Sequence, residues 1–308
     1  MTQRALFVGD ASWDTTIVTP RLPEVDEKVV VPNLFDCPGG VVANAAMAFV
    51  RTGAPAEMLA AVGDDLAGAE IVAGLERTGL VVIADRMRGR SSRAVTVLAD
   101  GCGGEKRLFL APGPTIYPSV SAIRAAELAD VSWVHTALYD LTAGLELAAR
   151  CRHAGIRFSV DLEPATIPAD AAALAPALDG CAAVMINSRA KAKLGTEGLA
   201  WLSALIAGEV IETLGPDGVR INHAAGDSYV IPAPALAADP VDTTGAGDAF
   251  AGWYIAELMA GSPPLVAAET AVAAATYSVQ RLGTYSSYPD RNELAAFVSD
   301  HNNRKATP

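Results

Sequence analysis

Cysteine is scarce in this sequence, and the four residues present are far apart. They are Cys37, Cys102, Cys151 and Cys181, and no Cys-x-x-Cys spacing occurs in the 308 residues. Such spacing argues against a disulfide framework and against a zinc site, and it is typical of proteins that work in a reducing compartment. We therefore predict a cytoplasmic protein.

Long apolar runs and basic runs are also absent. The apolar stretch that ends at Gly9 is too short for a signal peptide, and later stretches are interrupted by charge or glycine well before spanning length. The chain has 23 Lys and Arg against 35 Asp and Glu, a formal net charge of -12. An acidic chain without a basic run gains little from a phosphate backbone, so neither nucleic acid nor a membrane is expected as a partner.

The bulk composition favours a well-packed protein. Hydrophobic residues make up 51% and charged residues 19% of the chain, so a sizeable core can form. Segments typical of buried strands alternate with helical segments, several of which end at glycine. This pattern predicts an α/β fold with a mostly parallel sheet covered by helices on both faces. The expected strands are 5–9, 57–62, 131–137, 156–161, 182–186 and 210–214, and the expected helices are 43–51, 68–77 and 141–151.

Two stretches break the alternation and lack crossover helices. One is the β-branched run 28–35, and the other is a hairpin of strands 94–98 and 106–110 that turns through 100–104. We predict that they form a small β-sheet lid, with strands within about 15–37 and 90–112. No linker rich in Pro, Gly or Ser separates two halves, so residues 1–308 are expected to form a single domain. The polar tail after about residue 300 is expected to fray.

The most informative segment is Asp-Thr-Thr-Gly-Ala-Gly-Asp at 242–248, which leads into an expected helix at 249–260. A glycine-rich turn that opens a helix directs free N–H groups toward the positive end of the helix dipole, which makes a phosphate cradle. Asp248 lies in the first helical turn, where a carboxylate can take the proton of an attacking alcohol during phosphoryl transfer. The alternative is that Gly245 and Gly247 only shape a turn and Asp248 only favours the helix start. The chain has neither a Walker A loop nor a dinucleotide fingerprint at its first strand.

At these residues the sequence resembles the ribokinase, or phosphofructokinase-B (PfkB), family of carbohydrate kinases. A second family signature runs from Pro38-Gly-Gly-Val-Val-Ala-Asn44 to Ala61-Val-Gly-Asp-Asp-Leu-Ala-Gly68. The order of the expected elements also fits, so the resemblance covers essentially the whole chain. It implies a ribokinase-like three-layer α/β/α domain with a mostly parallel sheet and a β-sheet lid. It also implies ATP as phosphoryl donor, Mg²⁺ as phosphate counter-ion and, as in some relatives, a homodimer formed through the lid.

The resemblance assigns roles to individual positions. The catalytic base is Asp248, and the anion-hole amides are those of Gly245, Ala246 and Gly247. The acceptor-binding positions are Ser12, Asp14, Gly39, Gly40 and Asn44. The ATP-binding positions are Asn187, Thr213, Gly215 and Gly218. Asp242 and Thr244 match positions that in some members help to hold a monovalent cation such as K⁺.

Several of these roles are also reasonable from the residues alone. Polyols are bound by carboxylates, and Asp14 follows a first strand at the edge where α/β sheets bind ligands. Gly39 and Gly40 would let a small ligand approach the backbone closely. The alternatives remain open: Asp14 as a turn or cap residue, Asn44 as a helix-start residue, and the glycines of the 213–218 loop as residues of a simple turn.

The sequence departs from the family pattern at Ser12, at Val41-Val42, where smaller or polar residues are usual, and at Ala190. Many members carry Asn-x-x-Glu where this chain has Asn187-Ser-Arg-Ala190, so the acid that helps to organise Mg²⁺ is missing. Ser12 stands where ribokinases usually have Asn, which makes ribose a less certain acceptor. The predicted function is ATP-dependent phosphorylation of a hydroxymethyl group of a small sugar or sugar-like substrate. The alternatives are a nucleoside kinase, an acidic-sugar kinase in which Arg107 meets the acceptor's charge, and a catalytically weak sugar-binding relative.

Overall fold

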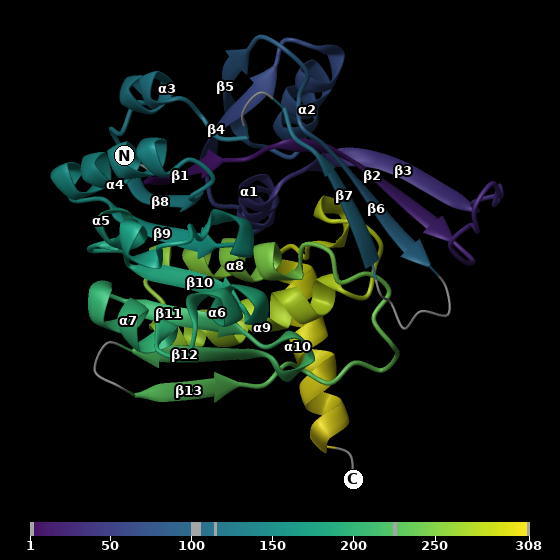
Figure 1. The fold of residues 1–308 in the computed structure, drawn as a ribbon. Helices are drawn as coiled ribbons and strands as arrows, with labels where there is room; N and C mark the ends of the chain where they lie inside the picture. The colour runs from purple at the N-terminus through teal and green to yellow at the C-terminus, as the bar shows by residue number, and fades with distance from the viewer. Residues whose placement is uncertain (1–2, 100–105, 114–115, 224–226, 307–308) are drawn as a thin grey trace.

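The computed structural model describes residues 3–99, 106–113, 116–223 and 227–306. Within these residues nine strands form one sheet in the order β13-β12-β11-β10-β9-β8-β1-β4-β5 (Figure 1). The sheet is parallel from β5 to β11, whereas β12 is antiparallel to both of its neighbours. Its strands are β1 (Arg4–Gly9), β4 (Ala56–Gly63), β5 (Val81–Met87), β8 (Val131–Ala137), β9 (Arg157–Leu162), β10 (Ala183–Asn187), β11 (Glu209–Thr213), β12 (Val219–His223) and β13 (Ser228–Ile231).

Helices cover both faces of this sheet and give three layers. One core cluster joins strand residues to α1, α2, α8, α9 and α10, and a second joins the opposite face to α3, α4, α5, α6 and α7. The expected α/β fold is thus confirmed. The helices are α1 (Val41–Arg51), α2 (Leu66–Glu76), α3 (Val120–Ala125), α4 (Leu141–Ala154), α5 (Ala175–Leu178), α6 (Ser188–Leu194), α7 (Gly198–Leu205), α8 (Ala246–Met259), α9 (Pro264–Ser278) and α10 (Arg291–Ala306).

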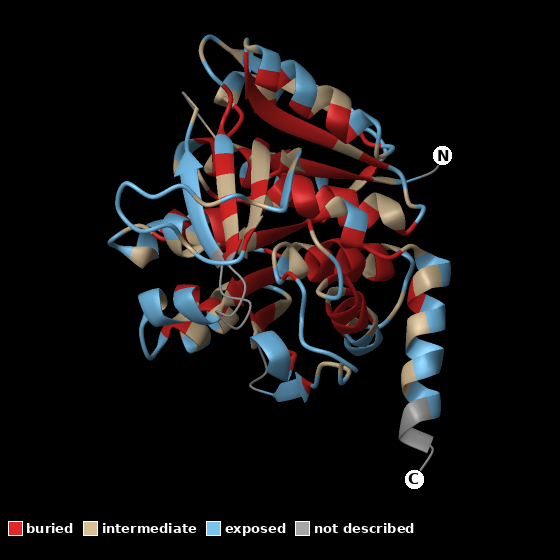
Figure 2. Cartoon of the chain, turned by 90° about the vertical axis from the view of Figure 1, so that its right-hand side faces the viewer, coloured by how far each residue is buried: buried red, intermediate tan, exposed pale blue. Residues whose placement is uncertain are grey.

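Helices α1 and α8 pack closely against each other, and residues 42–49 of α1 and 249–257 of α8 are buried. Figure 2, in which buried residues are red, shows buried helices in the middle of the molecule. Small residues make this approach possible, because α1 is rich in alanine and α8 carries Gly252 at the crossing. A Cβ atom on Gly252 would lie 2.4 Å from the Ala45 carbonyl oxygen. The two helices start at the same side of the molecule, so their first turns are held in a fixed relation.

The second sheet has the strand order β3-β2-β6-β7 and projects from the main body (Figure 1). Its strands are β2 (Ser12–Thr19), β3 (Asn33–Gly39), β6 (Arg93–Ala99) and β7 (Lys106–Ala111). We call this sheet the lid. The hairpin of β6 and β7 was predicted, although its 100–104 turn lies outside the described residues.

The predicted lid strand at 28–35 is wrong in position. Strand β3 begins only at Asn33 and runs to Gly39, so residues 28–32 lie outside it. The partner strand β2 was not predicted. It consists largely of β-branched residues and carries Asp14, for which a turn or cap residue was the alternative left open.

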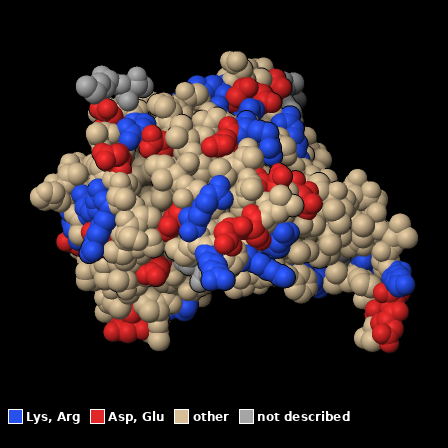
Figure 3. Space-filling view, turned by 90° about the horizontal axis from the view of Figure 1, so that it is seen from above, with Lys and Arg blue, Asp and Glu red and all other residues tan. Residues whose placement is uncertain are grey.

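The C-terminal tail does not fray after residue 300, since α10 continues to Ala306. The Asp290 carboxylate accepts from the backbone N–H groups of Asn292 and Glu293, both at 2.9 Å, and so caps the start of this helix. In the described part of the chain, no helix is both long and apolar enough to cross a membrane. On the face shown in Figure 3, basic side chains are interspersed with acidic ones.

Candidate active site

Residues from both sequence signatures meet where α1 and α8 begin. The Nδ2 group of Asn44, in the first turn of α1, donates to Oδ2 of Asp248, in the first turn of α8, at 2.8 Å. These residues are 204 positions apart in the sequence. The close crossing of the two helices sets this contact, which links the acceptor-binding signature to the phosphate-cradle signature.

Asn44 also has an unused hydrogen-bonding group. Its side chain is buried, with 6% exposed, and its Oδ1 atom has no hydrogen-bond partner among the described residues. A buried amide oxygen without a partner is costly unless a ligand or water satisfies it. Asn44 is therefore equipped to accept from a hydroxyl group beside Asp248.

The turn before α8 has the geometry of an anion cradle. Gly245 is the N-cap residue of the helix with φ 77°, a left-handed conformation that favours glycine. A Cβ atom there would lie 2.3 Å from the Tyr288 hydroxyl oxygen. By contrast, a Cβ atom on Gly247 would meet nothing within 4 Å. The space beside Gly247, at the positive end of the helix dipole, is thus open, whereas the Ala246 N–H makes a long hydrogen bond of 3.5 Å to the Thr243 carbonyl.

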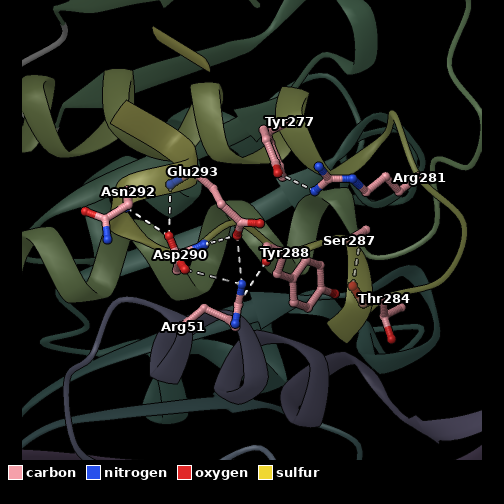
Figure 4. A network of polar contacts seen from close by, with 9 residues as sticks. All are labelled: Arg51, Tyr277, Arg281, Thr284, Ser287, Tyr288, Asp290, Asn292 and Glu293. Carbon is pink, nitrogen blue, oxygen red and sulfur yellow. Dashed lines mark hydrogen bonds and ion pairs between the residues drawn. The ribbon is translucent and has the colours of Figure 1, made fainter. Parts of the chain in front are cut away.

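The segment before α10 holds this turn in place. The Tyr288 hydroxyl donates to the Gly245 carbonyl at 3.2 Å. Burial, and next the charge of Asp248, raise the pKa of Tyr288 well above its usual value, so it remains a neutral donor. Arg51 of α1 donates to the Tyr288 carbonyl at 3.0 Å and to the Glu293 carboxylate at 2.8 Å (Figure 4). These contacts tie the cradle to α1 and α10.

The predicted acceptor loop is assembled at the base of the lid. Ser12 Oγ donates to Asp14 Oδ1 on β2, and Ser12 pairs with Gly39 on β3. A Cβ atom on Gly39 would lie only 2.0 Å from Asp14 Oδ2, and Gly40 has φ 109°, so both glycines are required for this packing. Burial raises the pKa of Asp14, and the hydrogen bond from Ser12 opposes that rise.

Asp10 is a site residue that the sequence reasoning missed. It follows β1, and its carboxylate accepts from the backbone N–H groups of Val41 at 2.7 Å and Val42 at 3.0 Å. Burial raises its pKa to about 6 despite these bonds. Asp10 thereby joins the end of β1 to the start of α1 and orients the helix that carries Asn44. Its position directly after a buried strand was the available signal.

Asp161, Glu163 and Tyr139 at this edge were also missed. Asp161 near the end of β9 has a pKa raised well above its usual value by burial and then by the charges of Glu163 and Asp248. Burial also raises the pKa of Tyr139, after β8, and the charges of Asp10, Glu163, Asp161 and Asp248 add to the effect. Several carboxylates of the site therefore lie near the neutral phenol of Tyr139. Each follows or ends a buried strand, which again was the only signal.

The predicted nucleotide residues lie at the next strands along the same edge. Asn187 at the end of β10 pairs with Thr213 at the end of β11. The Asn187 Oδ1 atom caps α6 by accepting from the N–H of Ala190 at 2.9 Å, and its Nδ2 group lies 3.4 Å from Glu163 Oε1. In the loop after β11, Gly215 has φ 61°, and a Cβ atom there would meet nothing within 4 Å.

Gly218 has a structural reason to be glycine. Its φ is 92°, and a Cβ atom would lie 2.0 Å from the Ile231 carbonyl oxygen. The turn alone therefore explains why position 218 is a glycine.

The predicted cation-binding residue Asp242 makes hydrogen bonds within the protein. Its buried carboxylate accepts from the N–H groups of Thr244 at 2.8 Å and Gly283 at 3.0 Å.

Comparison with known proteins decides the family. Residues 2–291 match the model of the family described as pfkB family carbohydrate kinase. The chain belongs to the pfkB family of carbohydrate kinases. It is 27% identical over 298 residues to an ATP-dependent ribose-1-phosphate kinase of Halopiger xanaduensis, covering 96% of this chain and 98% of that protein. It is 29% identical over 302 residues to a ribokinase of Bacillus subtilis, covering 95% and 98%.

Solved structures of ribokinases share the fold. The ribokinase of Giardia lamblia matches with a TM-score of 0.83 at 22% identity, covering 97% of this chain and 100% of that chain. An Arabidopsis thaliana ribokinase complexed with ribose and ATP matches with a TM-score of 0.78 at 21% identity, covering 97% and 99%. The resemblance inferred from the two sequence signatures is thus confirmed.

The structure shows what this pfkB-family chain has at the position of the glutamate in the Asn-x-x-Glu pattern. Ala190 is fully buried in the first turn of α6, so this position offers no charged group to the site. Glu163 instead places a carboxylate beside Asn187. Among the described residues, no group of three or more His, Cys, Asp or Glu side chains could by itself hold a metal ion.

Proposed function

We propose that this carbohydrate kinase transfers the γ-phosphoryl group of ATP to a hydroxymethyl group of a small sugar-like acceptor. The contact between Asn44 and Asp248 carries the proposal, because it joins the acceptor half of the site to the anion cradle. The relatives named as ATP-dependent ribose-1-phosphate kinase and as ribokinase complexed with ribose and ATP support ATP as the donor.

In this proposal Asp248 accepts the proton of the acceptor hydroxyl while its oxygen attacks phosphorus. The Asn44 Nδ2 group holds the Asp248 carboxylate in place, and the free Asn44 Oδ1 atom accepts from an acceptor hydroxyl. The backbone N–H groups of Gly245, Ala246 and Gly247 stabilise the charge on the transferred phosphoryl group. This preorganised cradle needs no rearrangement at the moment of transfer.

The acceptor is oriented by Asp14. Its carboxylate, positioned by Ser12 and packed against Gly39, can accept from two hydroxyl groups of a polyol. Gly40 lets the backbone turn from β3 into α1 beside Asp10, whose carbonyl oxygen would lie 2.7 Å from a Cβ atom on Gly40. The nucleotide lies on the other side of Asp248, along the ends of β10 and β11, where Asn187, Thr213 and the 215–218 loop contact it.

Two kinds of cation fit the residues present. Mg²⁺ prefers oxygen ligands and often uses only one or two carboxylates together with substrate phosphates. The Glu163 carboxylate, which lies beside Asn187, would hold it, and Mg²⁺ would neutralise phosphate charge. A monovalent cation such as K⁺ fits Asp242 and Thr244, since the buried Asp242 carboxylate forms no ion pair with a described residue. Each cation would lower the electrostatic cost of gathering phosphates among carboxylates.

The lid closes over the acceptor and keeps water from the γ-phosphate. Its other face, which carries the exposed Leu34, would pack against a second copy in a homodimer. We place the protein in the cytoplasm, where ATP is available.

Release of ADP in a coupled assay, measured over a panel of sugars, sugar acids, sugar phosphates and nucleosides, tests this function. The proposal predicts ADP release that depends on both the acceptor and Mg²⁺. Calorimetric binding of a sugar without any ADP release would contradict it and identify a sugar-binding relative instead.

A further inference from the structure

Tyr139 lies between the two halves of the proposed site. Across the middle of the main sheet the strands follow the order β11-β10-β9-β8-β1. The proposed nucleotide-binding residues Asn187 and Thr213 end β10 and β11. Asp10 follows β1 and accepts from N–H groups at the start of α1, the helix that carries Asn44. A phosphoryl group that moves from the nucleotide to the acceptor therefore passes the carboxyl ends of β9 and β8.

The strand register places Tyr139 level with the acidic residues of β9. Ala137 at the end of β8 pairs with Asp161 of β9. Tyr139 lies two residues beyond Ala137, and Glu163 lies two residues beyond Asp161. On its other side β8 pairs with β1, whose end leads into Asp10. Tyr139 thus follows the strand that separates Asp10 from Asp161 and Glu163.

The ring of Tyr139 is anchored over the end of the sheet. It is half-buried and packs against both core clusters, which lie on opposite faces of the sheet. The preceding residue, Leu138, is buried. The following residue, Asp140, caps α4 by accepting from the N–H of Ala143 at 2.9 Å. Because the backbone is held on both sides of Tyr139, its hydroxyl is presented at a defined position.

The Tyr139 hydroxyl is an available hydrogen-bond donor. It forms no hydrogen bond with another residue in the described part of the chain. The charges that act on it are the carboxylates of the site, Asp10 most strongly and then Glu163, Asp161 and Asp248. A phenol is neutral at ordinary pH, and burial and these carboxylates favour the neutral form further. The hydroxyl can therefore donate to an anion without adding negative charge.

The phosphoryl group needs such a donor on this side of the site. During transfer its charge is spread over three equatorial oxygens, and the amides that open α8 reach it from one direction only. On the β8 and β9 side the ionised carboxylates of Asp161 and Glu163 have no proton to donate. A preorganised neutral donor near developing charge is an effective catalytic group, and Tyr139 is well placed to supply it.

We propose that Tyr139 is a catalytic residue whose phenol donates a hydrogen bond to the phosphoryl group during its transfer. As the acceptor oxygen bonds to phosphorus, the bond from phosphorus to the leaving oxygen of ADP breaks and Asp248 takes the acceptor proton. Tyr139 keeps its own proton and stabilises an equatorial oxygen. This inference rests on the proposed kinase function and adds a catalytic group to it.

Tyr139→Phe tests the proposal, because it removes the hydroxyl and keeps the ring that packs against both core clusters. With the acceptor identified by the panel, we expect kcat for ADP release to fall by about 10²-fold. The KM values for ATP and for the acceptor should stay within about threefold, since the lost contact belongs to the transition state. Urea titration should give a midpoint close to that of the wild type.

Tyr117 supplies a matched control on the same strand. Its buried hydroxyl lies 2.6 Å from Thr136 Oγ1 of β8. Tyr117→Phe removes the same atom and should lower the midpoint of the urea titration, while kcat stays within roughly twofold of the wild type. An equal loss of kcat in the two variants, or a Tyr139→Phe enzyme as active as the wild type, overturns the proposal.

Binding of a transition-state mimic separates a catalytic role from a structural one. Fluoroaluminate with ADP, Mg²⁺ and the acceptor resembles the phosphoryl group in transit. Calorimetry should show equal affinities of wild type and Tyr139→Phe for ADP alone, and about 10²-fold weaker binding of the fluoroaluminate complex by the variant. Equal affinities for that complex contradict the proposal.

The same assays distinguish failure of this inference from failure of the kinase function. If the wild type releases no ADP with any acceptor, the proposed function fails and this inference fails with it. If the wild type turns over and Tyr139→Phe is equally active, only the role of Tyr139 is refuted.

Discussion

Replacing Gly247 by alanine should lower the activity of the protein without lowering its stability. A Cβ atom at this position meets nothing within 4 Å, and Gly247 lies inside α8. Alanine is therefore accommodated, and its higher helix propensity should raise the free energy of unfolding by about 0.5–1 kcal/mol. A urea titration measures this change.

The same methyl group should damage turnover. In a helix the Cα–Cβ bond tilts toward the N-terminus, so the methyl group of Gly247→Ala leans toward the mouth where we place the phosphate. Displacing a reacting group by about 1 Å can cost on the order of 10²-fold in rate. We expect kcat/KM for ATP to fall by about that factor in the ADP-release assay.

Gly245→Ala is the informative contrast. Gly245 has φ 77°, and its Cβ atom would lie 2.3 Å from the Tyr288 hydroxyl and 2.9 Å from Thr284 Cγ2. This variant should lose roughly 1–3 kcal/mol of stability as well as activity. If Gly247→Ala is as active as the wild type, the phosphate does not lie at the mouth of α8 and the reasoning is refuted.

Three other changes have expected outcomes. Asn44→Ala should lower kcat by about 10- to 100-fold, because it removes a charge-assisted hydrogen bond to Asp248; steady-state kinetics with an unchanged kcat would contradict this role. Asp10 has a pKa raised to about 6, so the folded protein binds this proton more tightly than the unfolded chain. Its stabilising contribution is complete below the ordinary pKa of about 4 and is lost as the pH rises through 6. Urea titrations should show that the wild type loses about 2 kcal/mol of stability relative to Asp10→Asn between pH 4 and 7. A parallel pH dependence of the two proteins would contradict the raised pKa of Asp10. Glu163→Gln should raise the Mg²⁺ concentration for half-maximal activity and weaken Mn²⁺ binding with ADP in spin-resonance titrations, whereas the exposed Glu197→Gln should do neither.

The sequence was sufficient for the main features of the fold because they depend on local patterns. Continuous apolar runs identify the parallel strands, and glycine marks the ends of several helices. The segment that ends in Asp248 contains its own cap, turn and helix start within a few residues. Its function as a cradle could therefore be inferred before its surroundings were known.

Features that depend on distant residues were harder to predict. Asp14 was identified, but β2 was not recognised as a strand, because its polar and β-branched residues pair with β3 and β6 and have no apolar alternation. Asp10 and Tyr139 are single polar residues after buried strands. Only the packing of the strand ends brings them together with Asp248.

The orientation of side chains in the lid also requires tertiary structure. A shift of one residue in strand pairing would exchange the two faces. From sequence alone Arg107 could have faced the acceptor, and only the observed register assigns it to the other face. The same register assigns Leu108 to the acceptor side.

Asp248→Asn tests the central claim most directly, since it removes the base and keeps the size of the side chain. Turnover should be measured with saturating ATP and acceptor, together with calorimetric binding of ADP and a urea titration. The account predicts a loss of turnover of about 10²- to 10⁴-fold, with ADP affinity and stability close to those of the wild type. Turnover near the wild-type value would contradict the assignment of Asp248 as the catalytic base.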